Sequence, residues 1–495
     1  MSGNKSYSKL MNGDSHMKVS PLRKKALKAT LALASTLAVV MPVSAMAQED
    51  LNTVLVRKTL VENHVSGVSL EALENKSIEQ MIESLKDPYT VLFTPQDYGQ
   101  FSNTLENSFE GIGCVIGLDD KGVYVSKPIP GSPAAIAGLQ KDDYIRAVDG
   151  VPASTTSIDE VRNKIIGVAG TKVKVTVLRG DKVLTFEITR QAVNSPEVYS
   201  SSFTNGVGYI QITDFSDEAD EEFDKELSAL QEKGLKSLIL DVRDNPGGYL
   251  ETARNIAKHF VKDGVLIHTK DRDGVDDPVN ITDGNPLGIP VYILANENSA
   301  SASEVLSGAL QDYGVAKVIG MQTYGKGSVQ QLFEFPDHSV LKVTVEEYLT
   351  PKMRKVNKEG ITPDLQVDGV SAQFITALHE SGISDIQVMI KKHGATYNGV
   401  DVGFGFGSFQ ENGKFYASAR GLAALIGAKI SWNNADRTVD ITDNKGTHAF
   451  PIEADKLMIV NDASYINVDL FDDYFPQLKV NVQGDSVSIQ GTKGN

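Results

Sequence analysis

The sequence predicts a multidomain α/β protein: an α/β core with a largely parallel sheet, preceded by helices and a small β-rich domain and followed by an α+β tail domain. Two observations predict this fold class. Between residues 192 and 370, apolar strand-like runs alternate with helical stretches, which is typical of a parallel sheet covered by helices. Between residues 109 and 191, short β-type runs are separated by Gly, Pro and Asp, which indicates a compact β-rich module. The length of 495 residues suits two to four domains.

The composition excludes several classes of protein. Apolar residues make up 41% of the chain and charged residues 23%, as in ordinary globular proteins. The formal charge of −16 argues against a nucleic-acid partner or an anionic-lipid surface, because both require basic residues. The single cysteine, Cys114, excludes an intrachain disulfide and a multi-thiolate metal site, and the histidines show no metal-ligand spacing. We therefore expect no metal and no cofactor.

The N-terminus has the pattern of a secretory signal peptide. Basic residues from Lys18 to Lys28 accompany the apolar run ALKATLALASTLAVVMPV, and Ala45 and Ala47 form an A-x-A cleavage site. Segment 1–47 is therefore excluded from the fold, and the protein is expected to be exported to the extracellular space or the cell envelope. Lys28 interrupts the apolar run, which makes it short for a membrane-spanning helix, although an uncleaved membrane anchor remains an alternative.

The first half of the mature chain contains two segments with different predicted secondary structure. Residues 48–108 are expected to be helical, because LNTVLVRKTLVENHV has apolar residues at helical spacing and SIEQMIESLKD begins with a serine that can cap a helix. Residues 109–191 instead contain short strand-like runs, VYVSKPI, KVKVTVL and VLTFEIT, with one helix expected at SIDEVRNKII.

Residues 192–370 form the predicted α/β core. The runs VGYIQI, SLILDV, VYILAN and AKVIGM are apolar enough to be buried strands, and DEEFDKELSALQEKG and SEVLSGALQDYG have helical patterns. LKVTVEEYLTP adds a strand that we expect to be antiparallel.

Residues 371–395 are expected to form a helical connector, and residues 396–495 a separate tail domain. The tail contains a predicted helix followed by a hairpin, in the stretch ARGLAALIGAKISWNNADRTVDIT. A weaker pattern of the same order, helix then hairpin, follows in NVDLFDDYFPQLKVNVQGDSVSIQG. The tail is therefore expected to consist of two similar halves, with Trp432 in its core.

The candidate catalytic or binding residues lie between Glu297 and Gln331, in the stretch ENSASASEVLSGALQDYGVAKVIGMQTYGKGSVQQ. Gly320, Gly325 and Lys326 fit the first part of a phosphate-binding loop. The next residue is glycine rather than Ser or Thr, however, and SVQQLFEFP then reads as a strand, whereas a phosphate loop opens a helix. An envelope NTPase is therefore disfavoured.

Two other interpretations of this stretch remain. A purely structural one has Ser301 and Glu304 as an S-x-x-E capping box at a helix start, followed by a plain turn around Lys326. In the other, a serine at a helix N-terminus is a nucleophile whose oxyanion is held by backbone N–H groups. The residues alone do not choose among Ser299, Ser301 and Ser303.

A serine nucleophile needs a base, and no histidine lies within 30 residues of Ser301. Lys326 can serve if it is neutral, because burial lowers the pKa of a lysine. Gln330 could orient the amine without adding charge. A strand–turn–helix at LILDVRDNPGGYLETA presents further N–H groups. The expected oxyanion hole consists of the backbone N–H of Ala302 with that of Gly247 or Gly248.

Four motifs in this order resemble the C-terminal processing, or tail-specific, serine proteases: DVRDNPGG, SASASE, YGKGSVQ and GITPD. The resemblance covers about residues 50–370. It implies a Ser–Lys dyad in which Ser301 is the nucleophile, Lys326 the base and Gln330 the assisting residue. It also implies protein or peptide substrates with accessible C-termini, and a homodimer formed through the N-terminal helices.

The β-rich module resembles a PDZ domain. FEGIGC contains the expected carboxylate-binding loop, Gly111, Ile112 and Gly113, and GSPAAIAGLQKDDYIRAVDG resembles the helix and strand that follow. Backbone N–H groups in such a loop can capture a terminal carboxylate while the peptide adds as a strand to the sheet edge. Cys114 is expected to be a buried small hydrophobe rather than a redox group.

The tail resembles the N-terminal domain of copper amine oxidases over ARGLAALIGAKISWNNADRTVDI, although it has no cluster of copper ligands. A cell-wall or other envelope partner is one expectation for this domain, and a passive spacer is the alternative.

Together these features predict an exported serine endopeptidase that recognises substrate tails through its PDZ domain and cleaves through an acyl-enzyme. A PDZ domain between two protease segments also suggests that it gates the site. The alternative from another class is a catalytically silent PDZ scaffold of the cell envelope, which the presence of Ser301, Lys326 and Gln330 disfavours. The expected domains are 1–47 signal peptide, 48–108 N-terminal helical segment, 109–191 PDZ domain, 192–370 protease core, 371–395 connector and 396–495 tail domain.

Overall fold

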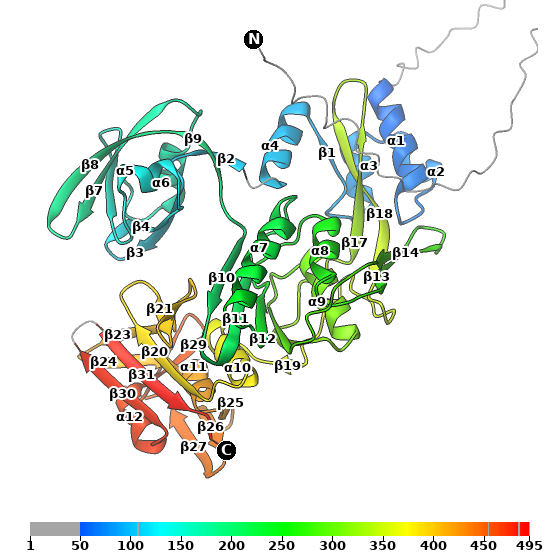
Figure 1. The fold of residues 1–495 in the computed structure, drawn as a ribbon. Coiled ribbons are helices and arrows are strands. Elements are labelled where there is room, and N and C mark those ends of the chain that lie inside the picture. Colours follow the sequence, from blue (N-terminus) through cyan, green and yellow to red (C-terminus); the bar gives the residue numbers. More distant parts are fainter. Residues whose placement is uncertain (1–49, 106–107, 454, 484–485, 495) are drawn as a thin grey trace, which may run out of the picture. The chain divides into compact units, whose positions relative to one another are not determined.

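The computed structural model describes residues 50–105, 108–453, 455–483 and 486–494 (Figure 1). The predicted signal peptide, 1–47, lies outside these residues. Within the described ranges, no helix has both the length and the apolar character that crossing a membrane requires.

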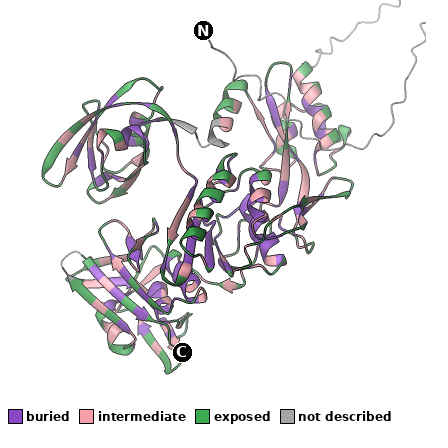
Figure 2. Ribbon diagram, viewed as in Figure 1, coloured by how far each residue is buried: buried purple, intermediate pink, exposed green. Residues whose placement is uncertain are grey.

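The α/β core is built on a six-stranded sheet in the order β10-β11-β12-β15-β16-β19. As predicted, the four apolar runs form parallel strands, and only β10 is antiparallel to its neighbour. Every residue of β12 is buried, as expected for a strand that is covered on both faces (Figure 2). The strands are β10 (Val198–Ser202), β11 (Val207–Ile212), β12 (Ser237–Asp241), β15 (Val291–Ala295), β16 (Ala316–Gly320) and β19 (Leu365–Gln366).

Helices cover both faces of this sheet. Successive side chains of a strand point to opposite faces. Ile210 and Leu240 pack in one apolar cluster with residues of α7, α8 and α9, whereas Tyr209 and Ile239 pack in another with residues of α10. The helices are α7 (Ala219–Glu232), α8 (Leu250–Ala257), α9 (Ala302–Asp312) and α10 (Val370–Glu380), and a short 3-10 turn, η1 (Thr204–Gly206), precedes β11.

A second, antiparallel sheet has the order β1-β18-β13-β14, with β17 also paired to β18. LKVTVEEYLTP forms most of β18, so the predicted antiparallel strand is confirmed. SVQQLFE forms β17, so the residues that follow the lysine loop form a strand rather than the helix that a phosphate loop requires. The strands are β1 (Val91–Phe93), β13 (Gly264–Lys270), β14 (Asp276–Ile281), β17 (Ser328–Glu334) and β18 (Val340–Leu349).

The N-terminal segment packs against this second sheet. Leu60 and Met81 share an apolar cluster with Leu341 and Val343 of β18. The segment is not helical throughout, because β1 interrupts it and pairs with β18. Its helices are α1 (Leu51–Asn63), α2 (Leu70–Leu73), α3 (Ile78–Ser84) and α4 (Pro95–Leu105).

The β-rich module has its own core and a sheet in the order β3-β4-β5-β7-β8, with β6 paired to β5. The helix predicted at SIDEVRNKII is α6, capped by Ser157. The strands that enter and leave the module, β2 and β9, pair with each other, and we call this pair the stem. The elements are β2 (Ser108–Gly111), β3 (Cys114–Asp119), β4 (Gly122–Pro128), α5 (Pro133–Ala137), β5 (Tyr144–Val148), β6 (Val151–Pro152), α6 (Ile158–Ile165), β7 (Lys172–Arg179), β8 (Lys182–Thr189) and β9 (Gln191–Asn194).

The tail consists of two similar halves, as predicted. The first half runs β24 (Lys414–Ser418), α11 (Ala419–Leu425), β25 (Lys429–Asn433) and β26 (Thr438–Asp443). The second half repeats this order as β29 (Ala463–Asn467), α12 (Val468–Tyr474), β30 (Leu478–Gln483) and β31 (Ser486–Thr492). The remaining strands are β20 (Asp385–Ile390), β21 (Ala395–Tyr397), β22 (Val400–Asp401), β23 (Ser408–Glu411), β27 (Gly446–Pro451) and β28 (Leu457–Val460).

Three expectations for this region need correction. The connector is helical only to Glu380, because the residues that follow form β20, which pairs with β31. The tail is not separate, since one continuous apolar cluster contains Tyr209 of the core sheet, Phe374 of α10 and Phe471 of α12. Trp432, which we expected in the core, is 45% exposed.

Candidate active site

The site lies at the carboxyl ends of β12 and β15, which are neighbouring parallel strands, and ligands commonly bind at this edge of such sheets. The loop after β12 contains Asn245 and the two glycines, and the loop after β15 leads to the serines. Backbone hydrogen bonds join the two loops, since Ala300 N–H donates to the carbonyl oxygen of Asn245 at 3.0 Å. The fold therefore brings the DNPGG and SASASE motifs together.

The three serines of the S-A-S-A-S run have different surroundings. Ser299 and Ser303 are fully buried, and their hydroxyls donate to the carbonyl oxygens of Val242 (2.7 Å) and Asn245 (3.0 Å). Ser301 is only half-buried and precedes the first residue of α9. The geometry therefore favours Ser301 as the nucleophile, a choice that the residues alone left open.

The backbone of Ser301 is strained. Its φ is 54° and its ψ is −115°, a region that residues with a side chain seldom adopt. Such a conformation costs about 1–3 kcal/mol and persists only where the surroundings impose it. Gly247 lies directly against this residue, because a methyl group on Gly247 would be 2.7 Å from the Ser301 Cβ. Strain of this kind is common at catalytic serines on sharp turns.

A single carboxylate connects the serine to the lysine loop. The fully buried Glu304 accepts hydrogen bonds from the N–H groups of Ser301 (3.0 Å) and Lys326 (2.8 Å) through Oε2. Its Oε1 accepts from Gly325 N–H (2.7 Å) and the Thr323 hydroxyl (2.5 Å). Burial raises the pKa of Glu304, whereas these hydrogen bonds lower it. Glu304 therefore fixes the start of α9 relative to the loop that carries Lys326.

The surroundings of Lys326 lower the pKa of its amine. Its Nζ lies 5.4 Å from the centroid of the Tyr89 ring. Burial lowers the pKa of Lys326, the charge of Lys342 lowers it further, and Glu304 opposes these effects. Burial and a hydrogen bond with Tyr324 raise the pKa of Tyr89 to about 12, so the ring beside the amine stays a neutral phenol.

The glycines beside Lys326 allow the close backbone approach that the sequence predicts. A methyl group on Gly327 would overlap the backbone of Asn357. Gly325 has a φ of 88°, and a methyl group there would be 3.0 Å from the Glu359 nitrogen. The GITPD motif supports the same loop, because Ile361 N–H donates to the Thr323 hydroxyl at 2.6 Å.

Gln330 lies on β17, close to the lysine loop. Its amide Nε2 is 2.9 Å from the Ser328 Oγ and 3.4 Å from the Thr344 Oγ1. Across the described ranges, Lys326 is not among its hydrogen-bond partners. A role for Gln330 in orienting the amine therefore remains a prediction.

Of the two candidate glycines, the structure favours Gly248 as an oxyanion-hole donor. The Gly247 N–H already donates to the Asn245 Oδ1 at 2.8 Å. In the part of the chain that the structure describes, the N–H groups of Gly248 and Ala302 have no acceptor. Free N–H groups beside the nucleophile are what an oxyanion hole requires.

The sequence reasoning missed three residues of the site and the full role of a fourth. The S-x-x-E pattern identified Glu304, but only as a helix cap. No local signal marks Tyr89 or Lys342, which reach Lys326 through tertiary packing. Arg243, inside the DVRDNPGG motif, forms a buried ion pair with Asp241 (2.5 Å) and donates to the Val370 carbonyl oxygen at 2.7 Å, which attaches the turn to α10.

The predicted carboxylate-binding loop, Gly111 to Gly113, leads directly into β3. The carbonyl oxygens of Ile112 and Gly113 are engaged by the start of α5, since they accept from Ala134 N–H (2.7 Å) and the Ser132 hydroxyl (2.7 Å). β3 is an edge strand of its sheet and packs beside α6. An open strand edge next to this loop is the arrangement that adding a peptide strand requires.

Cys114, the first residue of β3, is partly buried. Burial raises the pKa of its thiol to about 12, which keeps it protonated and unreactive. This agrees with the packing role predicted for it.

Three family models match the parts of the chain that contain the motifs. Residues 206–367 match the model of peptidase family S41, residues 124–179 that of the PDZ domain and residues 396–474 that of the copper amine oxidase N-terminal domain. A solved structure, the photosystem II D1 C-terminal processing protease, aligns with 64% of this chain and 92% of that chain, with 28% identity and a TM-score of 0.44.

Two curated relatives carry the family assignment. The chain is 36% identical over 315 residues to the carboxy-terminal processing protease CtpB of Bacillus subtilis, a match that covers 62% of this chain and 66% of that protein. It is 37% identical over 297 residues to the carboxyl-terminal-processing protease of a Picosynechococcus species, a match that covers 58% of this chain and 72% of that protein. The chain therefore belongs to peptidase family S41, the carboxy-terminal processing serine proteases.

Proposed function

We propose that this protein is an exported endopeptidase in which Ser301 and Lys326 form the catalytic dyad. The observation that carries the proposal is the Glu304 carboxylate, which hydrogen-bonds the backbone of both residues and so joins a half-exposed serine to a lysine of lowered pKa. A serine hydroxyl becomes a nucleophile when a neutral base accepts its proton.

The reaction then proceeds in two stages. Neutral Lys326 takes the proton as the Ser301 Oγ attacks the scissile carbonyl, and the N–H groups of Ala302 and Gly248 hold the oxyanion. The lysine next protonates the leaving amine. Water hydrolyses the acyl-enzyme by the reverse proton route, and Gln330 orients the amine without changing its charge.

Substrate recognition is assigned to the PDZ domain. The loop from Gly111 to Gly113 binds the terminal carboxylate, and the substrate tail pairs with the free edge of β3. Val115 and Leu118 of β3 are 47% and 42% exposed, which provides apolar contacts for a hydrophobic tail. A homodimer through the N-terminal helices is also proposed, because Leu51, Val54 and Leu70 of these helices are exposed apolar side chains.

Export is inferred from the signal-peptide pattern of residues 1–47. Expression of the full chain in a host with an intact secretion pathway, followed by sequencing of the recovered N-terminus, tests this. A mature protein that begins at Gln48 supports export, whereas an intact N-terminus in the cytosolic fraction contradicts it.

The dyad is tested on an unfolded substrate protein with an apolar C-terminus. We expect Ser301→Ala to abolish cleavage and Lys326→Ala to reduce kcat by at least about 100-fold, the scale of general-base catalysis. Lys262→Ala, at an exposed lysine outside the site, is the matched control and should cleave normally. Cleavage retained in both dyad variants would end the assignment and would favour the scaffold alternative.

A further inference from the structure

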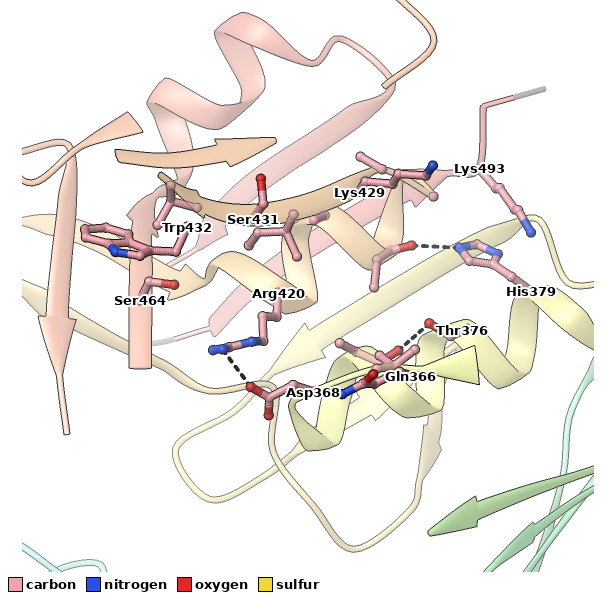
Figure 3. Close-up of a pocket in the computed structure, with 18 of the residues that line it drawn as sticks. Gln366, Asp368, Thr376, His379, Arg420, Lys429, Ser431, Trp432, Ser464 and Lys493 are labelled. Atoms are coloured by element: carbon pink, nitrogen blue, oxygen red, sulfur yellow. Dashed lines mark hydrogen bonds and ion pairs between the residues drawn. The ribbon is translucent and has the colours of Figure 1, made fainter. Parts of the chain in front are cut away.

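A groove of about 840 Å³ lies between the tail and the end of the α/β core (Figure 3). One wall is the edge strand β25 with the β28–β29 turn, and the opposite wall is α10 with the residues after β19. The dyad, the glycine turn and the lysine loop are absent from its lining, so the groove is distinct from the active site.

The groove runs along the edge of β25, and Val439 of β26, which pairs with Trp432, also lines it. Four consecutive residues of this strand, Lys429 to Trp432, line the groove. Because successive side chains of a strand point to opposite faces, an unbroken run of lining residues means that the backbone edge faces the cavity. β25 pairs only with β26, and within the described ranges no backbone bond reaches its other edge. An unpaired edge of this kind is a template for another strand.

The two ends of the groove differ in character. Trp432 and Ser464 lie at one end, and Lys429 and Lys493 at the other (Figure 3). The indole N–H of Trp432 donates to Asn434 at 2.8 Å, which holds the ring in place although 45% of the residue is exposed. An aromatic end and a cationic end therefore lie about 10 Å apart, the span of three strand residues.

The cationic end carries charge that the protein does not neutralise. Lys429 has no carboxylate within 4.0 Å in the part of the chain that the structure describes. Lys493 is 3.8 Å from Glu380, which also pairs with Lys317 at 3.5 Å. On a chain of formal charge −16, such a site attracts an acidic group.

The other charged groups of the lining are accounted for. Arg420 forms an ion pair with Asp368 at 2.6 Å. Both ring nitrogens of His379 face carbonyl oxygens, of Ile383 at 2.8 Å and Ala424 at 3.0 Å, so this side chain is not open to a ligand. Asp462 precedes Ser464 by two residues and so belongs to the tryptophan end, which increases the contrast between the two ends.

We propose that this groove binds an extended, acidic segment of a partner polypeptide, which adds as a strand to the free edge of β25. An apolar side chain of the segment packs on Trp432, and a carboxylate three positions away pairs with Lys429 and Lys493. Backbone pairing supplies affinity, and these two side-chain contacts supply specificity. The proposal goes beyond the protease activity and does not depend on it.

The chain contains a single tryptophan, so its fluorescence reports on the groove directly. The full chain carrying Ser301→Ala, which cannot cleave the probe, is titrated with acetyl-SETTLVTS-amide and with acetyl-STVLTTES-amide. These peptides place glutamate three positions before or after leucine, and their blocked ends prevent capture by a carboxylate loop. We expect one of them to give a saturable change in tryptophan emission, and the preferred order reveals whether the added strand is parallel or antiparallel.

Matched variants test the charge. Lys429→Glu replaces an attraction with a repulsion and should weaken binding about tenfold, whereas Lys479→Glu should leave it unchanged. Lys479 is an exposed lysine near the start of β30, the strand of the second half that corresponds to β25. A peptide with lysine in place of glutamate should bind about tenfold more weakly than its parent.

A third peptide tests the backbone pairing. N-methylation of two consecutive central residues removes the N–H that faces the strand edge in either register, and binding should be lost. No saturable emission change up to millimolar peptide, or equal weakening by Lys429→Glu and Lys479→Glu, would overturn the proposal. So would tight binding of hyaluronate in place of the peptides, which would assign the groove to a glycan, or self-association that Lys429→Glu abolishes, which would assign it to a second copy of the chain.

Discussion

The geometry of the site depends on one residue, Glu304, through its buried carboxylate. It replaces water as the acceptor for four donors in a fully buried position, and two of these donors belong to Ser301 and Lys326, the proposed nucleophile and base. Hydrogen bonds to a charged acceptor contribute about 1.5–3 kcal/mol each, so the loss of even one would displace the reactive groups.

We expect Glu304→Gln to lower kcat at least about tenfold with a smaller change in KM, because the substitution disturbs the positions of the reacting groups more than the contacts with substrate. Steady-state kinetics measures the effect, and thermal unfolding checks that the variant folds. Glu297→Gln, at an exposed glutamate on the same loop, is the control and should leave kcat and KM unchanged. Normal kcat in Glu304→Gln would remove the connecting role assigned to this carboxylate.

The charges around Lys326 predict that two substitutions shift the pH dependence of activity in opposite directions. Lys326, the proposed base, works when neutral, so kcat/KM should rise with pH around its pKa, which burial places below that of an ordinary lysine. Lys342→Met removes a positive neighbour, raises the pKa of Lys326 and should move this rise to higher pH. Glu304→Gln removes a negative neighbour and should move the rise of its residual activity to lower pH.

Lys262→Met, at an exposed lysine outside the site, serves as the control and should leave the pH profile unchanged. The profiles are measured with substrate well below KM, so that they report on the free enzyme. If Lys342→Met left the profile in place, the charge of Lys342 would have no part in tuning the base.

At the scale of elements, the lysine loop depends on two glycines that lie against the segment before GITPD. Gly327→Ala should displace the loop, because the added methyl group overlaps the Asn357 backbone. We expect kcat/KM to fall at least about 100-fold, the scale of a misplaced catalytic group, in a variant that stays folded by circular dichroism. Gly99→Ala on α4, where nothing lies within 4 Å of the added methyl group, should retain activity.

Much at this scale could be predicted from the sequence. The four apolar runs became parallel strands because continuous apolar composition fits a sheet buried on both faces, and the strand after Lys326 already argued against a phosphate loop. Trp432 was misplaced because an apolar residue in a short alternating strand does not reveal whether that strand lies inside a sheet or at its edge. Tyr89 and Lys342 were missed because sequence spacing carries no information about long-range packing.

At the scale of the whole molecule, the two additional domains are attached in different ways. The PDZ domain is joined through the stem, in which Ser108 pairs with Asn194, and has its own apolar cluster. The tail shares one cluster with α10 and the core sheet. Domain boundaries drawn from composition treated the two alike, because composition shows where patterns change but not which side chains pack together.

This difference predicts opposite outcomes of deletion. Removing Ser108–Asn194 and closing the gap with a few glycines should leave a folded protease, because paired strand residues lie only about 5 Å apart. Cleavage should continue but lose its preference for substrates with an apolar C-terminus. Unchanged preference would argue against tail recognition by this domain.

Truncation after Gly382 should instead give insoluble or strongly destabilised protein, because it uncovers the buried side chains of Phe374, Ile375 and Leu378 on α10. Soluble expression and thermal unfolding measure the effect. A truncated protein as stable as the full chain would show that the shared cluster contributes nothing to the fold of the core.

The shared cluster also bears on when the enzyme first becomes active during its synthesis. β31, which ends at Thr492, lies far after α10 in the sequence, yet it pairs with β20, the strand that directly follows this helix. A ribosome-bound chain therefore lacks the cover of one face of its core sheet until β31 has emerged. We expect a newly made copy to remain inert until β31 has been synthesised.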